Sequence, residues 1–560
     1  MHNWHHTHTM KTMTGLSLAS ALLASSISAH VHCPNSFSEN ACSLFTDSMA
    51  YLDYWWDPVA GYVFDESDQN GMNALRHETR TSVWYAVGLL ARNEGDDVAN
   101  AQRVLTQVIQ GQYKDESEQW FGTYTQEPEE PMVGAPDYAP QIYQSWDPNW
   151  RGFIGTSLII ALEEYSHLLS SEIQELVLDS LVNNTIGDSW RVGGADGDNL
   201  YPCYSNPSIM RAFVASWTGR RLSITNTTLA GEKYAAEFVA LFNNTNTLPE
   251  FNSPTYFGVS LYGLTLWYKY MPVDSILKQN ARRMIQATYE SVGELWHPGM
   301  RNIAGPWDRS YGWDMNKYFA VMAAWLWLFI EKERAGVFDR IGIMSHHSDF
   351  AFGPLIAILA ETHAEMVPEA VKERLSAFQG EHIYTAQAYS PPYDYAYRNY
   401  TTWISENVTI GAVSFDQDVV GGSSVSPGSW TPAAVQWYTG DPLDVGFIVN
   451  YPTETAIEAK VSPGTLNLTY PYGNSSSIFS LLLSPPSLKA NTRTVSSWAD
   501  VEALDVKVTT SPAMSMNLTF AGHYGGAESL FHDFEYYNFT YTMPMNVSGQ
   551  PSIQLEVQLR

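Results

Sequence analysis

The sequence predicts an α+β multidomain protein, in which an N-terminal α/α toroid of helical hairpins is followed by a C-terminal antiparallel β-sandwich. The first observation behind this is a change of period along the chain. In residues 83–90 apolar side chains recur at i, i+3, i+4 and i+7, as on one face of a helix. In residues 553–559 apolar and polar side chains alternate, as in a strand with one packed and one wet face. The second observation is that a buried helix and an amphipathic helix recur in pairs before residue 380.

Residues 305–330 contain the clearest example of a buried helix and the segment that leads into it. The first half is a glycine-broken loop that contains Trp307, Asp308, Arg309, Tyr311, Trp313 and Asp314. The second half, residues 318–330, is apolar or small on every side, which is typical of a helix buried all round. A run of this length is too short to span a bilayer, which takes about twenty residues. We therefore expect a polar, aromatic loop that leads into an inner helix of a large core.

The same pair of features recurs at least four times upstream. Inner helices are predicted within residues 76–93, 147–165, 201–217 and 251–267, each after a polar or aromatic lead-in segment that contains Pro or Gly in most cases. Amphipathic partners are predicted around residues 98–109, 171–181, 231–242 and 276–292. A first helix is predicted over residues 42–56, and a last helical piece over residues 354–378 with an interruption near Pro368.

Helical hairpins that repeat at a fixed period stack against one another. If the stack closes into a ring, the lead-in segments of all inner helices open at one end, which makes that end the place to look for a functional site. A straight solenoid of hairpins is the competing architecture.

The β region begins near residue 381, where Tyr and Pro accumulate. Short apolar runs then follow at residues 446–451, 465–470, 477–483 and 516–520, separated by Pro, Gly, Asn and Ser. We assign residues 1–29 to a signal peptide, residues 30–380 to the toroid and residues 381–560 to the β-sandwich.

The N-terminus and the sequons predict a secreted glycoprotein. Lys11 precedes a mildly apolar run, residues 16–27, and then Ser28 and Ala29, as in a signal peptide cleaved near Ala29. Ten Asn-x-Ser/Thr sequons follow, at Asn183, Asn226, Asn243, Asn399, Asn407, Asn467, Asn474, Asn517, Asn538 and Asn546. Ten such sites after a signal peptide predict N-linked glycans and an extracellular location.

Composition and charge exclude some classes of partner. The chain of 560 residues is 45% hydrophobic and 16% charged, and it has 59 Asp plus Glu against 30 Lys plus Arg, a net charge of −29. Because nucleic acids and anionic membranes bind basic surfaces, we expect neither as a partner, and no membrane span. Cys33 and Cys42 flank a short loop and are candidates for a disulfide in an oxidising compartment, which would leave Cys203 free.

No sequence signal requires a cofactor or a metal. A phosphate-binding glycine loop, a nucleophile elbow and a dinucleotide fingerprint are absent. His346, His347 and Asp349 lie in one loop, but two adjacent histidines rarely bind the same ion. We therefore expect no cofactor and no metal site.

The lead-in segments carry the candidate site residues, because loops on a rigid scaffold carry function more often than core positions do. The catalytic candidates are His77, Arg80, Asn149, Tyr256, Asp308, Arg309 and Tyr311. The substrate-binding candidates are Glu78, Asp147, Trp150, Asn252, His297, Trp307, Trp313 and Asp314. Aromatic rings stack on the C–H faces of pyranose rings, and Arg binds carboxylates in a bidentate geometry. The set therefore favours a polysaccharide or oligosaccharide as the substrate.

Elimination from a uronic acid needs a group that neutralises the carboxylate, a base, and an acid for the leaving oxygen. The candidates for neutralisation are Asn149, Arg80 and Arg309. Tyr256 or Tyr311, together with His77, can move the proton if the pKa values are suitable. Hydrolysis with inversion instead needs two carboxylates about 6.5–9.5 Å apart. The candidates for such a pair are Glu78, Asp147, Asp308 and Asp314.

Several of these residues also have a purely structural interpretation. Asp147 and Asp308 are suited to capping the helices that follow them. Glu78 and Arg80 can form an ordinary ion pair, and Tyr256 can belong to the core. The sequence leaves these alternatives open.

Two short segments, Asn149-Trp150 and residues 252–256 before an inner helix, are similar to segments of the secreted α/α-toroid, or six-hairpin, carbohydrate-active enzymes. The overall layout of the chain resembles these enzymes as well. A toroid followed by an antiparallel β domain is similar to the layout of the chondroitin and hyaluronan lyases. The resemblance implies cleavage of glycosidic bonds in a uronic-acid-containing polysaccharide by β-elimination, with an inverting hydrolase on the same toroid as an alternative. The same toroid also hosts terpenoid cyclases and a dehydratase–isomerase, and a non-catalytic glycan-binding protein is a further alternative.

Overall fold

The computed structural model describes residues 33–65, 76–195, 197–417, 430–486, 495–521, 536–545 and 547–560. Its helical part contains α1 (Glu39–Trp55), α2 (Thr79–Arg92), α3 (Asp97–Gln110), α4 (Trp150–Tyr165), α5 (Ser171–Ser189), α6 (Ser205–Arg221), α7 (Thr225–Thr245), α8 (Pro254–Tyr270), α9 (Ile276–Leu295), α10 (Val321–Trp327), α11 (Gly353–Ala364) and α12 (Glu369–Ser376). Short strands accompany them: β1 (Trp56–Asp57), β2 (Tyr62–Phe64), β3 (His77–Glu78), β4 (Trp296–His297) and β5 (Asn302–Ile303).

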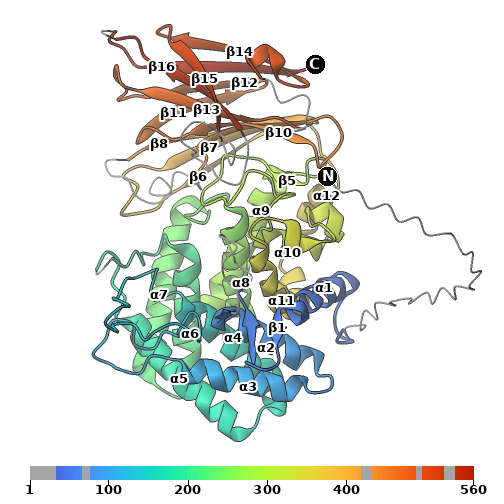
Figure 1. Cartoon of the computed structure of the whole chain (residues 1–560), viewed down its shortest axis with the longest axis vertical. Helices are drawn as coiled ribbons and strands as arrows, with labels where there is room; N and C mark the ends of the chain where they lie inside the picture. Colours follow the sequence, from blue (N-terminus) through green and yellow to red (C-terminus); the bar gives the residue numbers. More distant parts are fainter. Residues whose placement is uncertain are drawn as a thin grey trace, which may run out of the picture.

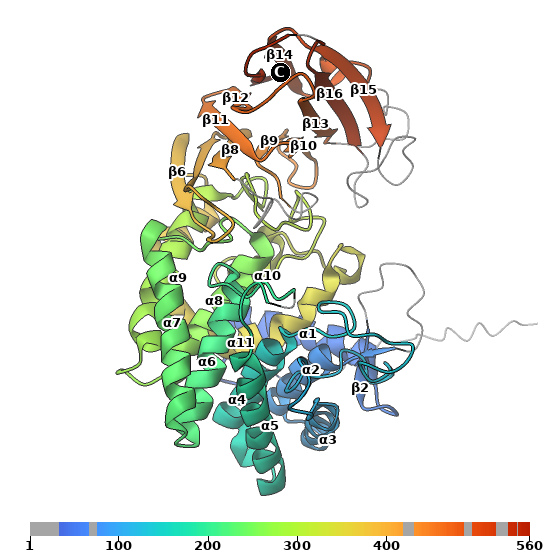
Figure 2. The same ribbon diagram turned by 90° about the vertical axis from the view of Figure 1, so that its left-hand side faces the viewer.

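The helices form a closed ring of hairpins. The inner helices α2, α4, α6 and α8 each pack on the next, α10 packs on α8, and α11 packs on both α8 and α2. Helices α3, α5, α7 and α9 lie outside them (Figures 1 and 2). The predicted toroid is confirmed, and the straight solenoid is wrong, because the last inner helix contacts the first.

Inner and outer helices differ in burial, as expected from sequences that are apolar on all sides in the inner helices and amphipathic in the outer helices. Helices α2, α4, α6 and α8 are buried on nearly every side, whereas α3 and α9 bury one stripe and expose the other. Helix α10 is shorter than the predicted run of residues 318–330. Tyr318 forms an isolated bridge with Ser345, and the Phe319 amide donates to the Ser345 carbonyl, so the chain is extended until Ala320.

The chain enters the β domain after α12. Its strands are β6 (His382–Ala388), β7 (Arg398–Ile404), β8 (Val408–Asp416), β9 (Ala433–Tyr438), β10 (Val445–Tyr451), β11 (Ala456–Ser462), β12 (Thr465–Thr469), β13 (Ile478–Ser484), β14 (Leu504–Ser511), β15 (Ser515–Ala521), β16 (Tyr536–Thr542) and β17 (Ser552–Leu559). They form one 12-stranded antiparallel sheet with the order β14-β17-β12-β11-β8-β9-β10-β13-β16-β15, and β6 and β7 extend from β8. The predicted antiparallel β-sandwich is confirmed as a fold class, with both layers belonging to one curled sheet (Figure 1).

The sheet curls at β8, which has different neighbours along its length. Residues 408–412 of β8 pair with β9, whereas Phe415 and Asp416 pair with β11. The strands beyond β11 therefore leave the first layer and cover it. Alternating apolar side chains of β12 and β17, such as Leu466 and Leu555, are buried between the layers.

The loop before α10 connects the two domains. Trp307 and Thr431 exchange both of their backbone hydrogen bonds, at 3.0 and 2.9 Å, so the loop is paired with the β domain. Thr402 on β7 donates from Oγ1 to the Gly305 carbonyl at 2.9 Å. A Cβ atom at position 411 of β8 would lie only 1.8 Å from that carbonyl oxygen, so the close approach of loop and sheet requires Gly411.

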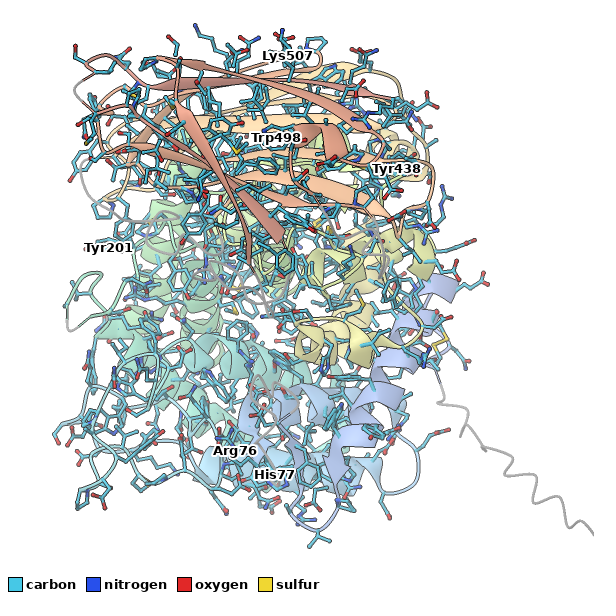
Figure 3. All side chains as sticks on the ribbon, turned by 45° about the horizontal axis from the view of Figure 1, so that its top comes forward. Arg76, His77, Tyr201, Tyr438, Trp498 and Lys507 are labelled. Carbon is cyan, nitrogen blue, oxygen red and sulfur yellow. A yellow bond between two sulfur atoms is a disulfide. The ribbon has the colours of Figure 1, made fainter. Side chains whose placement is uncertain are left out.

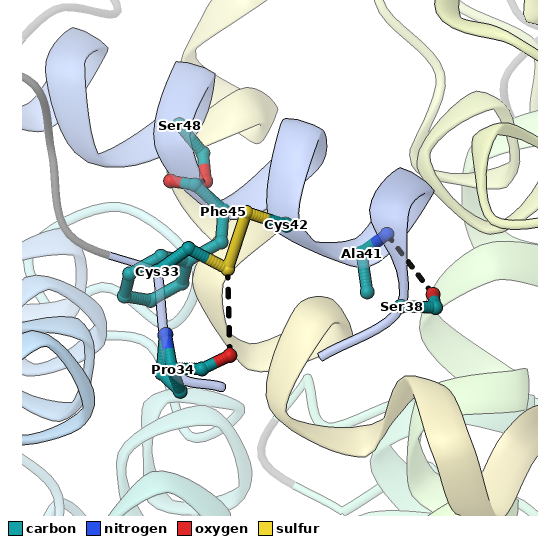
Figure 4. Close-up of a disulfide and its surroundings, with 7 residues drawn as sticks. All are labelled: Cys33, Pro34, Ser38, Ala41, Cys42, Phe45 and Ser48. Atoms are coloured by element: carbon teal, nitrogen blue, oxygen red, sulfur yellow. Dashed lines mark hydrogen bonds between the residues drawn. A yellow bond between two sulfur atoms is a disulfide. The ribbon is translucent and has the colours of Figure 1, made fainter. Parts of the chain in front are cut away.

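At the other end of the chain, Cys33 and Cys42 form a disulfide that ties the segment before α1 to the first turn of that helix (Figure 4). Cys203 is free and buried. The predicted signal peptide and the sequon at Asn546 lie outside the described residues. Among the residues that are described, no helix combines the length and apolar character needed to cross a bilayer.

Candidate functional site

Seven side chains from the lead-in segments of five inner helices come together on the ring. They are Asn149, Tyr204, Glu250, Tyr256, Arg309, Tyr311 and His346, which we call the tyrosine–arginine cluster. The segments that supply them precede or begin α4, α6, α8, α10 and α11. Because neighbouring inner helices start at the same end of a closed ring, segments far apart in sequence lie side by side there.

Arg309 lies at the centre of the cluster. Its Nη1 atom is 2.7 Å from Oε1 of Glu250, and its guanidinium carbon lies 3.9 Å from the ring centroid of Tyr256 and 5.0 Å from that of Tyr204. Ser253 donates from Oγ to the Arg309 carbonyl at 3.0 Å, which fixes the backbone at a φ of +49°. The Arg309 side chain is nevertheless 28% exposed, so this oriented cation is open to an anionic group of a ligand.

Two phenols, an imidazole and a carboxylate follow one another beside Arg309. The hydroxyl groups of Tyr256 and Tyr311 share a hydrogen bond. The Tyr311 ring stacks on the ring of His346, with centroids 3.9 Å apart and planes at 15°. Oδ2 of Asp349 lies 3.0 Å from Nδ1 of His346. These are the residue types that transfer protons in enzymes.

Asn149 closes the cluster on the α4 side. Its Nδ2 donates to the Tyr204 hydroxyl at 3.0 Å, while its Oδ1 is buried without a hydrogen-bond partner among the described residues. Arg80 lies next to this position, with its guanidinium carbon 5.1 Å from the Trp150 ring and Nη2 2.8 Å from Oε1 of Glu78. The ion pair between Glu78 and Arg80 is therefore present.

Burial and the positive charge of Arg309 have opposite effects on the pKa values of the phenols in the cluster. Burial raises the pKa of Tyr256 well above its usual value and that of Tyr204 to about 12, and Arg309 opposes the rise in both. Burial likewise raises the pKa of Tyr311, again against the effect of Arg309. Burial acts to lower the pKa of Arg309, but Tyr256 and Glu250 outweigh it and the pKa is raised. At neutral pH the cluster thus holds neutral phenols around a permanent cation.

A buried arginine of the β domain fixes two of the segments that build the cluster. Arg398 on β7 donates from Nη1 to Oδ2 of Asp308 at 3.0 Å and from Nη2 to the Pro249 carbonyl at 2.6 Å. Asp308 precedes Arg309, and Pro249 precedes Glu250. One guanidinium therefore contacts the neighbours of both partners in the Glu250–Arg309 ion pair.

The remaining donors of Arg398 are also used. Nε donates to Oδ2 of Asp394 at 2.9 Å, Nη1 to the Tyr400 hydroxyl at 2.8 Å and Nη2 to Oγ of Ser390 at 2.7 Å. We call this set, with Asp308 and Pro249, the Arg398 network. Burial raises the pKa of Asp308 to about 6, and Arg398 opposes that rise.

Four of the seven predicted catalytic residues, Asn149, Tyr256, Arg309 and Tyr311, are in the cluster. Arg80 lies beside it, and Asp308 is buried in the Arg398 network. His77 lies elsewhere: its ring nitrogens face Glu129 and Asp57, and its ring stacks on Phe64. In Figure 3 it lies beside Arg76 and well apart from Tyr201. The histidine that the fold brings to the cluster is His346.

Most of the predicted substrate-binding residues have structural partners. The Nε2 atom of His297 lies 3.0 Å from the Ser405 carbonyl, and Nδ2 of Asn252 donates to the carbonyls of Ala304 and Pro306, both at 2.7 Å. Burial lowers the pKa of His297. These two side chains hold loops together and are not open to a ligand.

The other predicted substrate-binding residues are also accounted for by the fold. Trp307 and Trp313 are each 1% exposed and pack in the apolar cluster that includes Phe447 of the β domain, so neither ring presents a face to a sugar. Trp150 is buried beneath Arg80. Three carboxylates accept hydrogen bonds from nearby donors: Asp147 from the Asn149 amide, Asp314 from the Asn316 amide, and Glu78 from Arg80.

Three members of the cluster, Tyr204, Glu250 and His346, were not among the predicted site residues, and nor was Arg398. Glu250 stands two residues before the predicted segment 252–256, so a wider window would have included it. His346 lies in a loop that the sequence presents only as a weak metal signal. In the described part of the chain, no group of three or more His, Cys, Asp and Glu side chains is arranged to hold a metal ion.

We expect the substitution Arg398→Met to lower the free energy of unfolding by about 3–5 kcal/mol, because it leaves Asp308 and Asp394 buried without their cation. Denaturant or thermal unfolding measures the loss. The matched control is Arg560→Met, which breaks the exposed pair with Asp505 and should cost about 0–1 kcal/mol. Equal losses in the two variants would contradict the importance of the buried network, and adding Asp308→Asn to Arg398→Met should restore part of the stability.

Comparison with known proteins gives a family but no function. No curated protein matches the sequence. Three solved structures are similar to it: heparinase III (11% identity, 94% of this chain and 87% of that chain, TM-score 0.49), a second heparinase III (8%, 94% and 86%, 0.31), and the heparan sulfate lyase HepC from Pedobacter heparinus (8%, 93% and 75%, 0.23).

Two family descriptions match consecutive parts of the chain. The Domain of unknown function (DUF8770) matches residues 380–558, which cover the strands of the β domain up to the next-to-last residue of β17. The Domain of unknown function (DUF8769) matches residues 42–361, more than half of the chain and the part that supplies the tyrosine–arginine cluster. The protein therefore belongs to the DUF8769 family.

Proposed function

We propose that the protein is a secreted carbohydrate-active enzyme that cleaves glycosidic bonds of a uronic-acid-containing polysaccharide by β-elimination. The observation that carries this proposal is the position of Arg309, an oriented and partly exposed cation in contact with the rings of Tyr204 and Tyr256. An anion binder beside a pair of hydrogen-bonded phenols is what this reaction needs.

Arg309 is suited to the carboxylate of the substrate, and Asn149 to a hydroxyl group next to it. The C5 proton of a uronate becomes acidic when the negative charge that develops on the carboxylate is stabilised, and a fixed guanidinium provides that stabilisation in a site of low dielectric. The unpartnered Oδ1 of Asn149 is an acceptor, so it suits a hydroxyl group of the same sugar and not the ionised carboxylate. We therefore place the uronate between these two side chains.

Tyr256 is the base in this proposal, and Tyr311 donates a hydrogen bond to its phenolate. The phenolate of Tyr256 takes the proton from C5, the electron pair forms the C4–C5 double bond, and the C4–O4 bond breaks. The proton on Tyr256 then passes to the leaving O4. One residue serves first as base and then as acid, so the step is balanced and leaves the enzyme unchanged.

The carboxylates of the region support elimination rather than hydrolysis. An inverting hydrolase needs one carboxylate to activate a water and one carboxylic acid to protonate the leaving group. Glu250 of the cluster is paired with Arg309, and Asp349, which lies outside the cluster, is 3.0 Å from His346. Asp308 and Asp314 are buried. Glu78 is paired with Arg80, and Asp147 accepts from the Asn149 backbone amide, so each of the four carboxylates that the sequence suggested for hydrolysis is either buried or engaged within the fold.

Secretion and N-glycosylation are also proposals, supported by the accessibility of the acceptor residues. None of the nine described sequon asparagines is buried. Asn226, Asn243, Asn399, Asn474 and Asn517 are exposed, and the other four are half-buried. A glycan needs an acceptor at the surface, which these positions provide.

The substitution Tyr256→Phe removes the proposed base but keeps the ring under Arg309. We expect it to lower turnover about 100-fold or more, in line with the contribution of general acid–base catalysis. The assay follows the ultraviolet absorbance of unsaturated uronide products on a panel of uronic-acid polysaccharides. Tyr54→Phe, on the exposed side of α1, is the matched control and should keep full activity.

The wild-type protein itself decides between the alternatives in the same assay. New reducing ends without a rise in absorbance would replace elimination with hydrolysis. Neither signal on any polysaccharide would leave cyclase or dehydratase–isomerase chemistry, or glycan binding without catalysis, as the function.

The pH dependence of kcat/KM tests the identity of the base. Only the phenolate of Tyr256 can accept the C5 proton, and its pKa is raised. The rate should therefore increase about tenfold per pH unit from neutral into alkaline pH, as expected for a base that is mostly protonated. A plateau that begins near pH 6 to 7 would instead assign the base to a histidine such as His346.

Peptide N-glycosidase tests the proposed glycosylation. Protein secreted by a eukaryotic host should lose mass on treatment with this enzyme, and N-terminal sequencing should start near His30. Replacing exposed Asn226 by Gln should remove one step from the mass ladder. Retention of residues 1–29, or no change in mass, would contradict the secretory route.

A further inference from the structure

A pocket of about 310 Å³ lies next to the tyrosine–arginine cluster. Trp146 and Pro148 from the segment before α4 line one part of it, and the next residue, Asn149, belongs to the cluster. Trp190 and Arg191, at the end of α5, line another part. We call it the Trp190 pocket. The chemistry proposed above gives it no role.

Trp190 is an exposed aromatic side chain on a polar surface. It is 41% exposed, and one face of the indole stacks on Phe121, with centroids 5.0 Å apart and planes at 30°. The ring is therefore held in a fixed orientation while part of it is open to the pocket. A rigid indole of this kind presents an apolar platform on which the C–H face of a pyranose ring stacks.

Two buried arginines line the same pocket and are anchored through only part of their guanidinium groups. Arg151 donates from Nε and Nη2 to the Phe121 carbonyl, at 3.1 and 2.7 Å. Arg191 donates from Nε and Nη2 to the carboxylate of Asp198, at 3.0 and 2.9 Å. The two side chains are 1% and 5% exposed respectively, so their orientation is fixed before any ligand binds.

The remaining nitrogen of each guanidinium approaches Asp188 without reaching hydrogen-bond distance. Nη1 of Arg151 lies 3.6 Å and Nη1 of Arg191 lies 4.0 Å from Oδ1 of Asp188. That oxygen is buried and has no hydrogen-bond partner among the described residues. Donors that lack a close acceptor, in side chains that line a pocket, favour a ligand that brings oxygen atoms.

The charge at the pocket favours an uncharged ligand. The two arginines carry two positive charges, and the carboxylates of Asp188 and Asp198 carry two negative charges. Glu116 and Glu118, which line the pocket, add two further negative charges. A carboxylate or sulfate group would therefore meet a net negative surface, whereas a hydroxyl group can accept from a guanidinium and donate to a carboxylate.

We infer that the Trp190 pocket is a binding subsite for one uncharged pyranose unit, stacked on Trp190 and hydrogen-bonded to Arg151 and Arg191. The inference rests on the proposed function for its context, since the adjoining unit of the same polysaccharide would be the uronate in the cluster. A polymer in which a uronic acid alternates with a neutral sugar fits both sites at once.

Calorimetric titration of the full-length glycoprotein with cellohexaose tests the subsite apart from catalysis. The wild type should bind, and Trp190→Ala should weaken binding about tenfold through loss of the stacking platform. Arg191→Lys, which removes the planar fork but keeps the charge, should also weaken binding. Tyr54→Ala, another exposed aromatic residue but on α1, should bind as the wild type does.

Because the readout is binding, it does not depend on turnover. Binding that requires Trp190 in a protein without elimination activity would retain the subsite and reject the proposed reaction. Equal affinity in wild type and Trp190→Ala, or no binding of cellohexaose by the wild type, would overturn the subsite. Preferential, Trp190-dependent binding of a sulfated hexasaccharide would overturn the assignment to an uncharged unit.

If elimination is active, Trp190→Ala should raise KM for the polysaccharide and leave kcat unchanged.

Discussion

The hydrogen bonds of Arg398 connect the two domains at the place where the candidate site is built. This side chain comes from the β domain, yet its donors reach Asp308 and the Pro249 carbonyl of the helical domain. Those two residues adjoin Arg309 and Glu250. The position of the central cation of the site therefore depends on a residue that lies 89 positions further along the chain from Arg309.

A buried network of this kind is costly to desolvate, and its value lies in geometry more than in net stability. Asp308 and Asp394 share one guanidinium, and burial still raises the pKa of Asp308 to about 6. Around it the domains are joined by backbone pairing of Trp307 with Thr431, and Gly411 makes room for the Gly305 carbonyl. The β domain is thus part of the framework that orients the cluster, and the helical ring alone does not complete it.

The site combines a preorganised cation with groups whose protonation burial has shifted. Around Arg309 the phenols are neutral at rest, and the same cation that we propose as the anion binder also favours the phenolate form. Beside it, the Trp190 pocket has a different character, with paired charges and an apolar platform. Two adjoining sites with different preferences would select a polymer by its alternation of charged and uncharged units, which neither site could do alone.

The sequence by itself determined the fold class, because the periods of 3.6 and 2 are set by burial on one face or on all faces of each element. Runs such as residues 254–267 are apolar all round and had to be inner helices. The same pattern placed polar residues at the starts of those helices, and that rule made Asn149, Tyr256, Arg309 and Tyr311 candidates. Only the tertiary structure decided which of these side chains face one another. Closure of the ring brought His346 to Tyr311 and left His77 with Asp57 and Glu129. Docking of the β domain buried Trp307 and Trp313 and supplied Arg398. These contacts join residues that are far apart in the chain, and a local pattern carries no information about them.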